Sequence, residues 1–161
     1  HFYNEMLKRA FLFSCFCGLR HSDIAALTWE NLRKDKAGNT QLHIIQQKTQ
    51  EIISLPLSSE ALKQLPERGK ALDTERGFNG LISLGRTNEV LSRWGKDAGI
   101  QKHITFHTAR HTHATMMITL GADIYTVSKL LGHTNIQTTQ IYAKIVDESK
   151  SKAIALIPEI T

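Results

Sequence analysis

The sequence predicts an α+β fold that is mainly α-helical and contains one short β region. Along most of the chain, apolar residues recur at intervals of three and four, which is typical of the inner face of helices. Between Leu32 and Leu57 they alternate with polar residues instead, which is typical of strands. At 161 residues and 41% apolar content, the chain is long enough for one domain with a core and too short for two. We therefore expect a single domain over residues 1–161.

The first half contains three predicted helices and two predicted strands. The first helix is an apolar run that ends at Gly18, and a short second helix follows in "HSDIAALTWENL", with Ser22 as its N-cap. The strands are "LHIIQQ" and "EIISLPL", and the tight connection "QKTQ" between them places Lys48 at or near a β-turn. The third helix is "SSEALKQL", capped by Ser58 or Ser59.

The second half begins with the polar, Gly-rich loop "PERGKALDTERGFNG" and continues as helices. Helical spacing returns in "TNEVLSRWGKDAGI". A longer helix is expected in "ITFHTARHTHATMMITLG", with Thr105 as its cap and Gly121 as its stop. The stretches "DIYTVSKLLGH" and "NIQTTQIYAKIVDESKSKAIALI" predict two final helices.

Charge and cysteine usage limit the class of protein. A net charge of +5, with 20 Lys and Arg against 15 Asp and Glu, favours a polyanionic partner such as nucleic acid. Cys15 and Cys17 stand one residue apart, where a disulfide would be strained, so we expect free thiols in a reducing compartment. The sequence has neither a run of about 18 apolar residues nor a leader pattern, which predicts an intracellular, soluble protein. Because the chain starts at His1 inside a helical pattern, we expect a fragment of a longer protein.

Arginine, lysine and tyrosine stand at three places beside apolar, structure-forming residues. Arg20 follows the first helix, where it is either a surface cation near a helix end or a ligand for an anion. In the second interpretation Asp23 fixes the guanidinium, whose bidentate geometry suits phosphate oxygens. Lys48 and Tyr142, each taken alone, are a solvated turn residue and a packed aromatic.

A fourth place is the histidine-rich stretch "HTARHTH". Helical steps of three and four put His107 on the same face as Arg110 and His111, whereas His113 points elsewhere. The histidines of this cluster are either packing residues with hydrogen bonds or members of a site, and His113 is expected to be structural.

Two histidines at this spacing could also bind zinc as part of a metallohydrolase. His103 or His133 would then supply the third ligand. A zinc protease places glutamate directly after the first histidine, and here Thr108 occupies that position. This pattern therefore disfavours a metal site.

The stretch "LLGHTNIQTTQIY" holds His133 nine residues before Tyr142. Together with its flanks it also has the pattern of helix, Gly-containing turn and second helix. A helix-turn-helix DNA-binding module without chemistry is therefore an alternative function for the chain.

In chain order, "CGLRHSDI", "QKTQEIISLPL", "HTARHTHAT" and "LLGHTNIQTTQIY" resemble the successive signatures of the tyrosine recombinases of the phage-integrase type. The resemblance covers nearly the whole chain and matches the catalytic domain. It implies an α+β, mainly α-helical fold with a small antiparallel three-stranded sheet. It also implies that the family's N-terminal DNA-clamping domain lies outside this chain. Residues 146–161 are expected to form a tail that either is exchanged between subunits or packs on its own domain.

The resemblance implies a site-specific recombinase or integrase that breaks and rejoins DNA. Tyr142 matches the nucleophile, which attacks the scissile phosphodiester to form a 3′-phosphotyrosyl intermediate before religation to a new 5′-hydroxyl. Arg20 and Arg110 match the pair that holds the phosphate, and Lys48 matches the lysine that protonates the leaving 5′-oxygen.

The remaining matches are three histidines and one acid. His107 matches the first histidine of the His-x-x-Arg motif, and His133 matches a histidine that hydrogen-bonds the phosphate. Asp23 stands where the family has an acid that braces the first arginine, and His111 corresponds to a common structural histidine. The side chains supply the cations, so the resemblance implies no metal and no cofactor. The implied partner is double-stranded DNA, on which the protein assembles as a homotetramer, although a monomer in isolation is compatible with it. We expect a cytoplasmic protein that works at the nucleoid.

Overall fold

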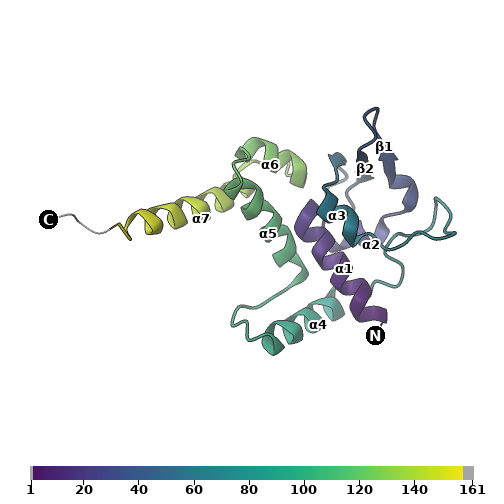
Figure 1. Ribbon diagram of the computed structural model, residues 1–161, viewed down its shortest axis with the longest axis horizontal. Coiled ribbons are helices and arrows are strands. Elements are labelled where there is room, and N and C mark those ends of the chain that lie inside the picture. Colours follow the sequence, from purple (N-terminus) through teal and green to yellow (C-terminus); the bar gives the residue numbers. More distant parts are fainter. Residues whose placement is uncertain (1, 158–161) are drawn as a thin grey trace. The chain divides into compact units, whose positions relative to one another are not determined.

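A computed structural model describes residues 2–157 of the chain (Figure 1). The chain forms two compact units, the first ending at His113 and the second beginning at Ala114. The boundary falls inside helix α5 (Phe106–Thr119). Each unit is described below by itself.

The first unit is built on helix α1 (Phe2–Cys17), which buries Leu7, Ala10 and Phe13. Gly18 follows with a φ of +74°, a left-handed conformation that glycine adopts without steric cost. The predicted stop of this helix is confirmed. Helix α3 (Ser59–Gln64) packs beside α1 (Figure 1).

The unit has two short helices, α2 (His21–Ala26) before the sheet and α3 between the sheet and the long loop. The predicted second helix is α2, but its N-cap is Arg20. The prediction that Ser22 caps it is wrong, because the backbone turns into the helix at His21 and leaves Ser22 inside the first turn. Helix α3 has the predicted cap, since the Ser58 hydroxyl accepts from the Ala61 N–H at 3.2 Å.

Three antiparallel strands form a sheet in the order β1-β2-β3. They are β1 (Leu32–Lys34), β2 (Thr40–Ile45) and β3 (Ile52–Pro56). Leu42 on β2 pairs with Leu55 on β3, and both side chains are buried, so alternate residues of the two strands face the core. The small antiparallel three-stranded sheet of the predicted fold is confirmed.

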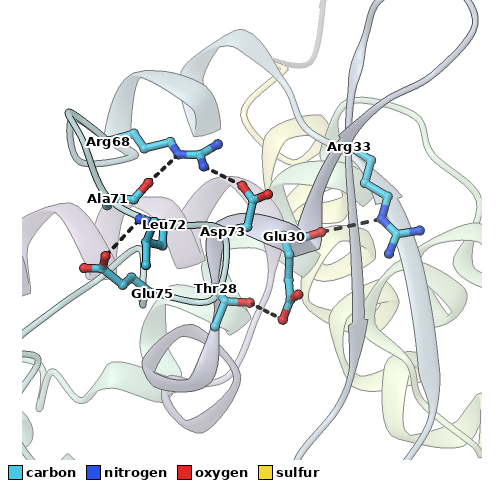
Figure 2. A network of polar contacts seen from close by, with 8 residues as sticks. All are labelled: Thr28, Glu30, Arg33, Arg68, Ala71, Leu72, Asp73 and Glu75. Atoms are coloured by element: carbon cyan, nitrogen blue, oxygen red, sulfur yellow. Dashed lines mark hydrogen bonds and ion pairs between the residues drawn. The ribbon is translucent and has the colours of Figure 1, made fainter.

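A short 3-10 helix, η1 (Trp29–Asn31), leads from α2 to the sheet, and the long loop over residues 66–80 runs along it. The Trp29 N–H donates to the Glu75 carbonyl at 3.2 Å. Figure 2 shows how the loop is held, with the Arg68 guanidinium bonded to both Asp73 and the Ala71 carbonyl. The predicted loop therefore has fixed contacts, and it holds the segment between α2 and β1.

Helix α4 (Leu84–Asp97) and the start of α5 complete the first unit. The Phe106 ring at the start of α5 lies edge-on to Phe11 and to His21, with centroids 5.9 and 5.0 Å away. These ring contacts join α5 to α1 and α2. The first unit's candidate site residues come from the start of α2, from α5 and from the β2–β3 turn.

In the second unit, α5 ends at Thr119 and the chain turns at Gly121, whose φ is +100°. Helix α6 (Ile124–Leu131) begins at Asp123, whose carboxylate accepts from the Thr126 N–H at 2.9 Å. The predicted stop at Gly121 is confirmed.

Helix α6 ends at Gly132, which has a left-handed φ of 64°, and the His133 N–H donates back to the Ser128 carbonyl at 3.0 Å. Helix α7 (Gln137–Ile154) follows. The unit's core cluster consists of Ala114, Val127, Leu131 and Tyr142. Among the described residues, no helix combines the length and the apolar character that crossing a membrane requires.

Candidate active site

The two candidate phosphate-binding arginines are brought near each other by the end of α1. Arg20 follows that helix by three residues and caps α2. The Arg110 side chain is buried, with 1% of its surface exposed, and its Nη1 donates to the Gly18 carbonyl at 2.7 Å. This bond ties α5 to the backbone two residues before Arg20.

Within residues 2–157, Arg20 and Asp23 each keep a buried polar atom without a hydrogen-bond partner. These atoms are Nη1 of Arg20 and Oδ2 of Asp23. A buried donor that finds no partner inside the protein is costly, so the Arg20 N–H is suited to an acceptor from outside, such as a phosphate oxygen. No ion pair joins Arg20 to Asp23 in this part of the chain.

The Asp23 carboxylate instead bonds to the turn between β2 and β3. Its Oδ1 accepts from the Gln47 N–H at 2.8 Å, and the Asp23 side chain is 3% exposed. Gln47 directly precedes Lys48, whose side chain is exposed. The turn predicted around Lys48 is confirmed, and Asp23 connects it to the helix that Arg20 caps.

The charges of the first unit's candidate cations act on His107. Partial burial lowers the pKa of His107, and the charges of His111, Arg110, Arg20 and Lys48 lower it further. The His107 and His111 rings meet edge-on, with centroids 4.4 Å apart. The lowered pKa favours the neutral form of His107 at neutral pH.

Four histidines of the first unit should make its stability depend on pH. Burial lowers the pKa of His21, His107, His111 and His113 below the usual value near 6.5. Below that value the histidines bind protons in the unfolded chain but not in the folded unit. Their contribution to the free energy of unfolding is therefore complete above about pH 6.5 and is lost as the pH falls through their pKa values in the folded unit. We expect the melting temperature to be level from pH 8 to about 7 and to fall towards pH 5. Circular dichroism melts across this range test this, and a melting temperature that rises below pH 6.5 would contradict it.

The zinc alternative lacks a set of ligands. His107 and His111 lie side by side, but within residues 2–157 no three His, Cys, Asp or Glu side chains gather where they could hold a metal ion. Moreover, the positive charges of Arg20, Lys48 and Arg110 act on His107. These charges would repel a metal ion bound to His107.

The other two candidate residues, His133 and Tyr142, form a group of their own in the second unit. His133 Nδ1 lies 2.8 Å from the Thr139 hydroxyl, which is fully buried on α7. The Tyr142 side chain is 3% exposed and belongs to the unit's core cluster. As predicted, the histidine follows one helix and the tyrosine lies on the next.

Sequence reasoning missed the residues that hold these candidates in place. Gln46 is fully buried and accepts from the Thr49 hydroxyl at 2.8 Å, inside the turn of Lys48. Its position two residues after Ile44 continues the inward row of β2, so a polar residue on an apolar face was the available signal. For Thr139 the sequence offered no signal beyond its place in a pair of neighbouring threonines.

The chain is similar to known proteins along most of its length. The family model described as "Phage integrase family" matches residues 3–149. Tyrosine recombinase XerC of Neisseria meningitidis serogroup B is 36% identical over 137 residues, covering 80% of this chain and 44% of XerC. A tyrosine recombinase of Pseudothermotoga lettingae is 32% identical over 145 residues, covering 86% of this chain and 49% of the relative. The chain thus spans less than half the length of these two relatives.

Solved structures share the fold at low sequence identity. The XerH site-specific recombinase bound to palindromic difH substrate, in a post-cleavage complex, matches with a TM-score of 0.66 and 17% identity, over 96% of this chain and 51% of XerH. A lambda integrase dimer bound to a COC′ core site matches with a TM-score of 0.68 and 22% identity, over 85% of this chain and 41% of the integrase. The predicted recombinase-like catalytic-domain fold is confirmed. Since the family model covers most of the sequence, the chain belongs to the phage integrase family.

Proposed function

We propose that this chain is the catalytic domain of a site-specific DNA recombinase or integrase. Tyr142 attacks a scissile phosphodiester through its hydroxyl oxygen, the bond from phosphorus to the 5′-oxygen breaks, and a 3′-phosphotyrosyl link forms. A 5′-hydroxyl from another strand then reverses the step and releases the tyrosine. Because the covalent link conserves the energy of the broken bond, no ATP is required.

The observation that carries the proposal is that the first unit binds Arg110 to the backbone beside Arg20 and binds Asp23 to the turn of Lys48, with the charges of all three cations acting on His107. Negative charge grows on the phosphate oxygens in the transition state, and fixed cations aimed at that charge stabilise it. The unpartnered N–H of Arg20 adds a donor that is buried from solvent. The side chains therefore supply the charge that the reaction needs.

Proton transfer at the two ends of the reaction is assigned to His107 and Lys48. A phenol has a pKa of about 10, so at neutral pH it needs help to lose its proton. His107, neutral and next to the cations, is the base we propose for that proton. Lys48, exposed on its turn, gives a proton to the leaving 5′-oxygen. In the same scheme His133 donates a hydrogen bond to the phosphate.

The proposed partner is double-stranded DNA, on which the protein assembles as a homotetramer. A net charge of +5 suits a polyanion. Three apolar side chains near the end of the chain, Ile154, Leu156 and Ile157, are exposed. We assign the tail from residue 146 onward to docking on a neighbouring subunit, although its last part, 158–161, lies outside the described residues. The site of action would be the bacterial nucleoid in the cytoplasm.

Covalent capture tests the proposed function. The 161-residue chain is incubated with a pool of duplexes that carry a nick at a fixed position and random flanking sequence. Cleavage beside the nick releases a short oligonucleotide, so religation fails and the protein stays attached to DNA. We expect an adduct that survives boiling in detergent and is unchanged by EDTA, with peptide mass spectrometry placing the nucleotide on Tyr142.

The same experiment separates the helix-turn-helix alternative. A non-catalytic module would bind the duplexes reversibly, and added salt would release it completely. Salt-reversible binding without any adduct would reject the recombinase assignment for this chain, and an adduct mapped to another residue would reject the assignment of Tyr142.

A further inference from the structure

The turn that carries Lys48 is closed by its own backbone. The Gln46 N–H donates to the Glu51 carbonyl and the Gln50 N–H donates to the Gln46 carbonyl, both at 2.9 Å. Gln50 has a φ of +57°, a left-handed conformation that is uncommon for a residue other than glycine. The loop between β2 and β3 is therefore a defined turn.

Gln46 contributes a buried polar side chain to this turn. It follows Leu42 and Ile44 in the inward row of β2, and its side chain is fully buried. Burying an amide among apolar residues costs free energy unless it is hydrogen-bonded. Its Oε1 accepts from the Thr49 hydroxyl at 2.8 Å. The bond fixes the residue that directly follows Lys48.

The residue on the other side of Lys48 is fixed as well. The Gln47 N–H donates to Asp23, as described above, at 2.8 Å. Lys48 thus stands between two anchored neighbours while its own side chain is exposed. A lysine side chain is long and flexible, so the position of its ammonium group depends on where the backbone holds it.

We propose that Gln46 is a positioning residue for Lys48, acting through its bond to Thr49. This inference rests on the proposed function, in which Lys48 protonates the leaving 5′-oxygen. When the bond is lost, the turn samples other conformations and the ammonium group is less often within reach of that oxygen. A small displacement of a proton donor is costly, because transfer requires hydrogen-bond distance.

The variants that test this break the same bond from its two ends. Gln46→Met keeps an unbranched side chain of similar length and removes the acceptor, whereas Thr49→Val keeps the shape and removes the donor. Each should slow cleavage of ordinary DNA by about 10- to 100-fold. The double variant should be no slower than the slower single variant, because both changes remove one interaction. Gln41→Met, at the other end of β2, is the matched control and should cleave at the wild-type rate.

A second substrate separates positioning of Lys48 from general damage. In this DNA the bridging 5′-oxygen is replaced by sulfur, and a thiolate leaves without being protonated because a thiol has a pKa of only about 8.5. Lys48→Ala is the reference variant. It should cleave ordinary DNA slowly and cleave the sulfur-substituted DNA at a rate near that of the wild type. Gln46→Met and Thr49→Val should follow the same pattern.

Three results overturn the proposal. The first is an equal loss of cleavage rate on both substrates in the single variants. The second is no loss of rate on ordinary DNA, and the third is a double variant whose loss is the product of the two single losses. If Gln46→Met does not fold, Thr49→Val decides alone, because it leaves the buried glutamine in place. The proposed function fails separately if wild-type protein cleaves neither substrate, or if sulfur does not rescue Lys48→Ala, and either result also removes the basis for this inference.

Discussion

Replacement of Tyr142 by phenylalanine is expected to lower formation of the covalent DNA adduct by at least about 10⁴-fold, to below detection. The change removes one oxygen, and in the proposed reaction that oxygen forms the new bond to phosphorus. The ring stays in the core cluster with Ala114, Val127 and Leu131. Folding should therefore survive, and a thermal melt beside the adduct gel checks both quantities.

Tyr125→Phe is the matched control for this variant. Tyr125 lies on α6 in the same unit, and 60% of its side chain is exposed. It contacts Lys129, whose ammonium group lies 5.3 Å from the ring centroid. The Tyr125 hydroxyl has no role in the proposed reaction, so adduct formation should equal that of the wild type. A Tyr142→Phe protein that still forms the adduct would show that another group is the nucleophile.

Arg110→Lys is expected to reduce both stability and activity. The guanidinium is buried and donates to the Gly18 carbonyl, whereas an ammonium group on a shorter side chain cannot reproduce its planar, multiple contacts. We expect a loss of about 2–4 kcal/mol in the free energy of unfolding. We also expect a fall of about 10²- to 10³-fold in the rate of adduct formation, because one of the two arginines proposed to hold the phosphate is lost.

Arg9→Lys provides the comparison for Arg110→Lys. Arg9 also donates to backbone carbonyls, those of Lys63 and Leu65, but it is partly exposed and lies outside the candidate site. Its replacement should cost less than about 1 kcal/mol and leave the rate of adduct formation unchanged. Urea unfolding and single-turnover cleavage measure the two effects. The role assigned to Arg110 would be wrong if the two variants behaved alike.

Local signals in the sequence predicted much of the fold. Gly18, Gly121 and Gly132 end helices as expected, since each adopts the left-handed conformation that glycine tolerates at the end of a helix. Ser58 caps a helix as expected, because a cap depends on residues within one turn of it. The prediction for Ser22 failed because Arg20 begins the helix two residues earlier.

The contacts that hold the candidate site were beyond reach of the sequence. The bond from Arg110 to Gly18 joins residues 92 positions apart, and the bond from Gln47 to Asp23 joins residues 24 positions apart. Patterns within a short stretch of sequence cannot predict contacts between residues so far apart. The resemblance to a family named the candidate residues, whereas only the fold reveals that Asp23 is bonded to the turn of Lys48.

The burial of Tyr142 bears on when cleavage can begin. With 3% of its surface exposed, Tyr142 is packed in the core of its unit, and little of it faces a phosphate that arrives from solvent. If Tyr142 is the nucleophile, its side chain must first leave the core cluster that it forms with Ala114, Val127 and Leu131. Exposing a buried aromatic ring costs roughly 2–3 kcal/mol, so unaided the reactive form would be present in about one molecule in a hundred. The resting chain would then be protected against cutting DNA at random, and assembly on the correct site would have to supply the missing free energy.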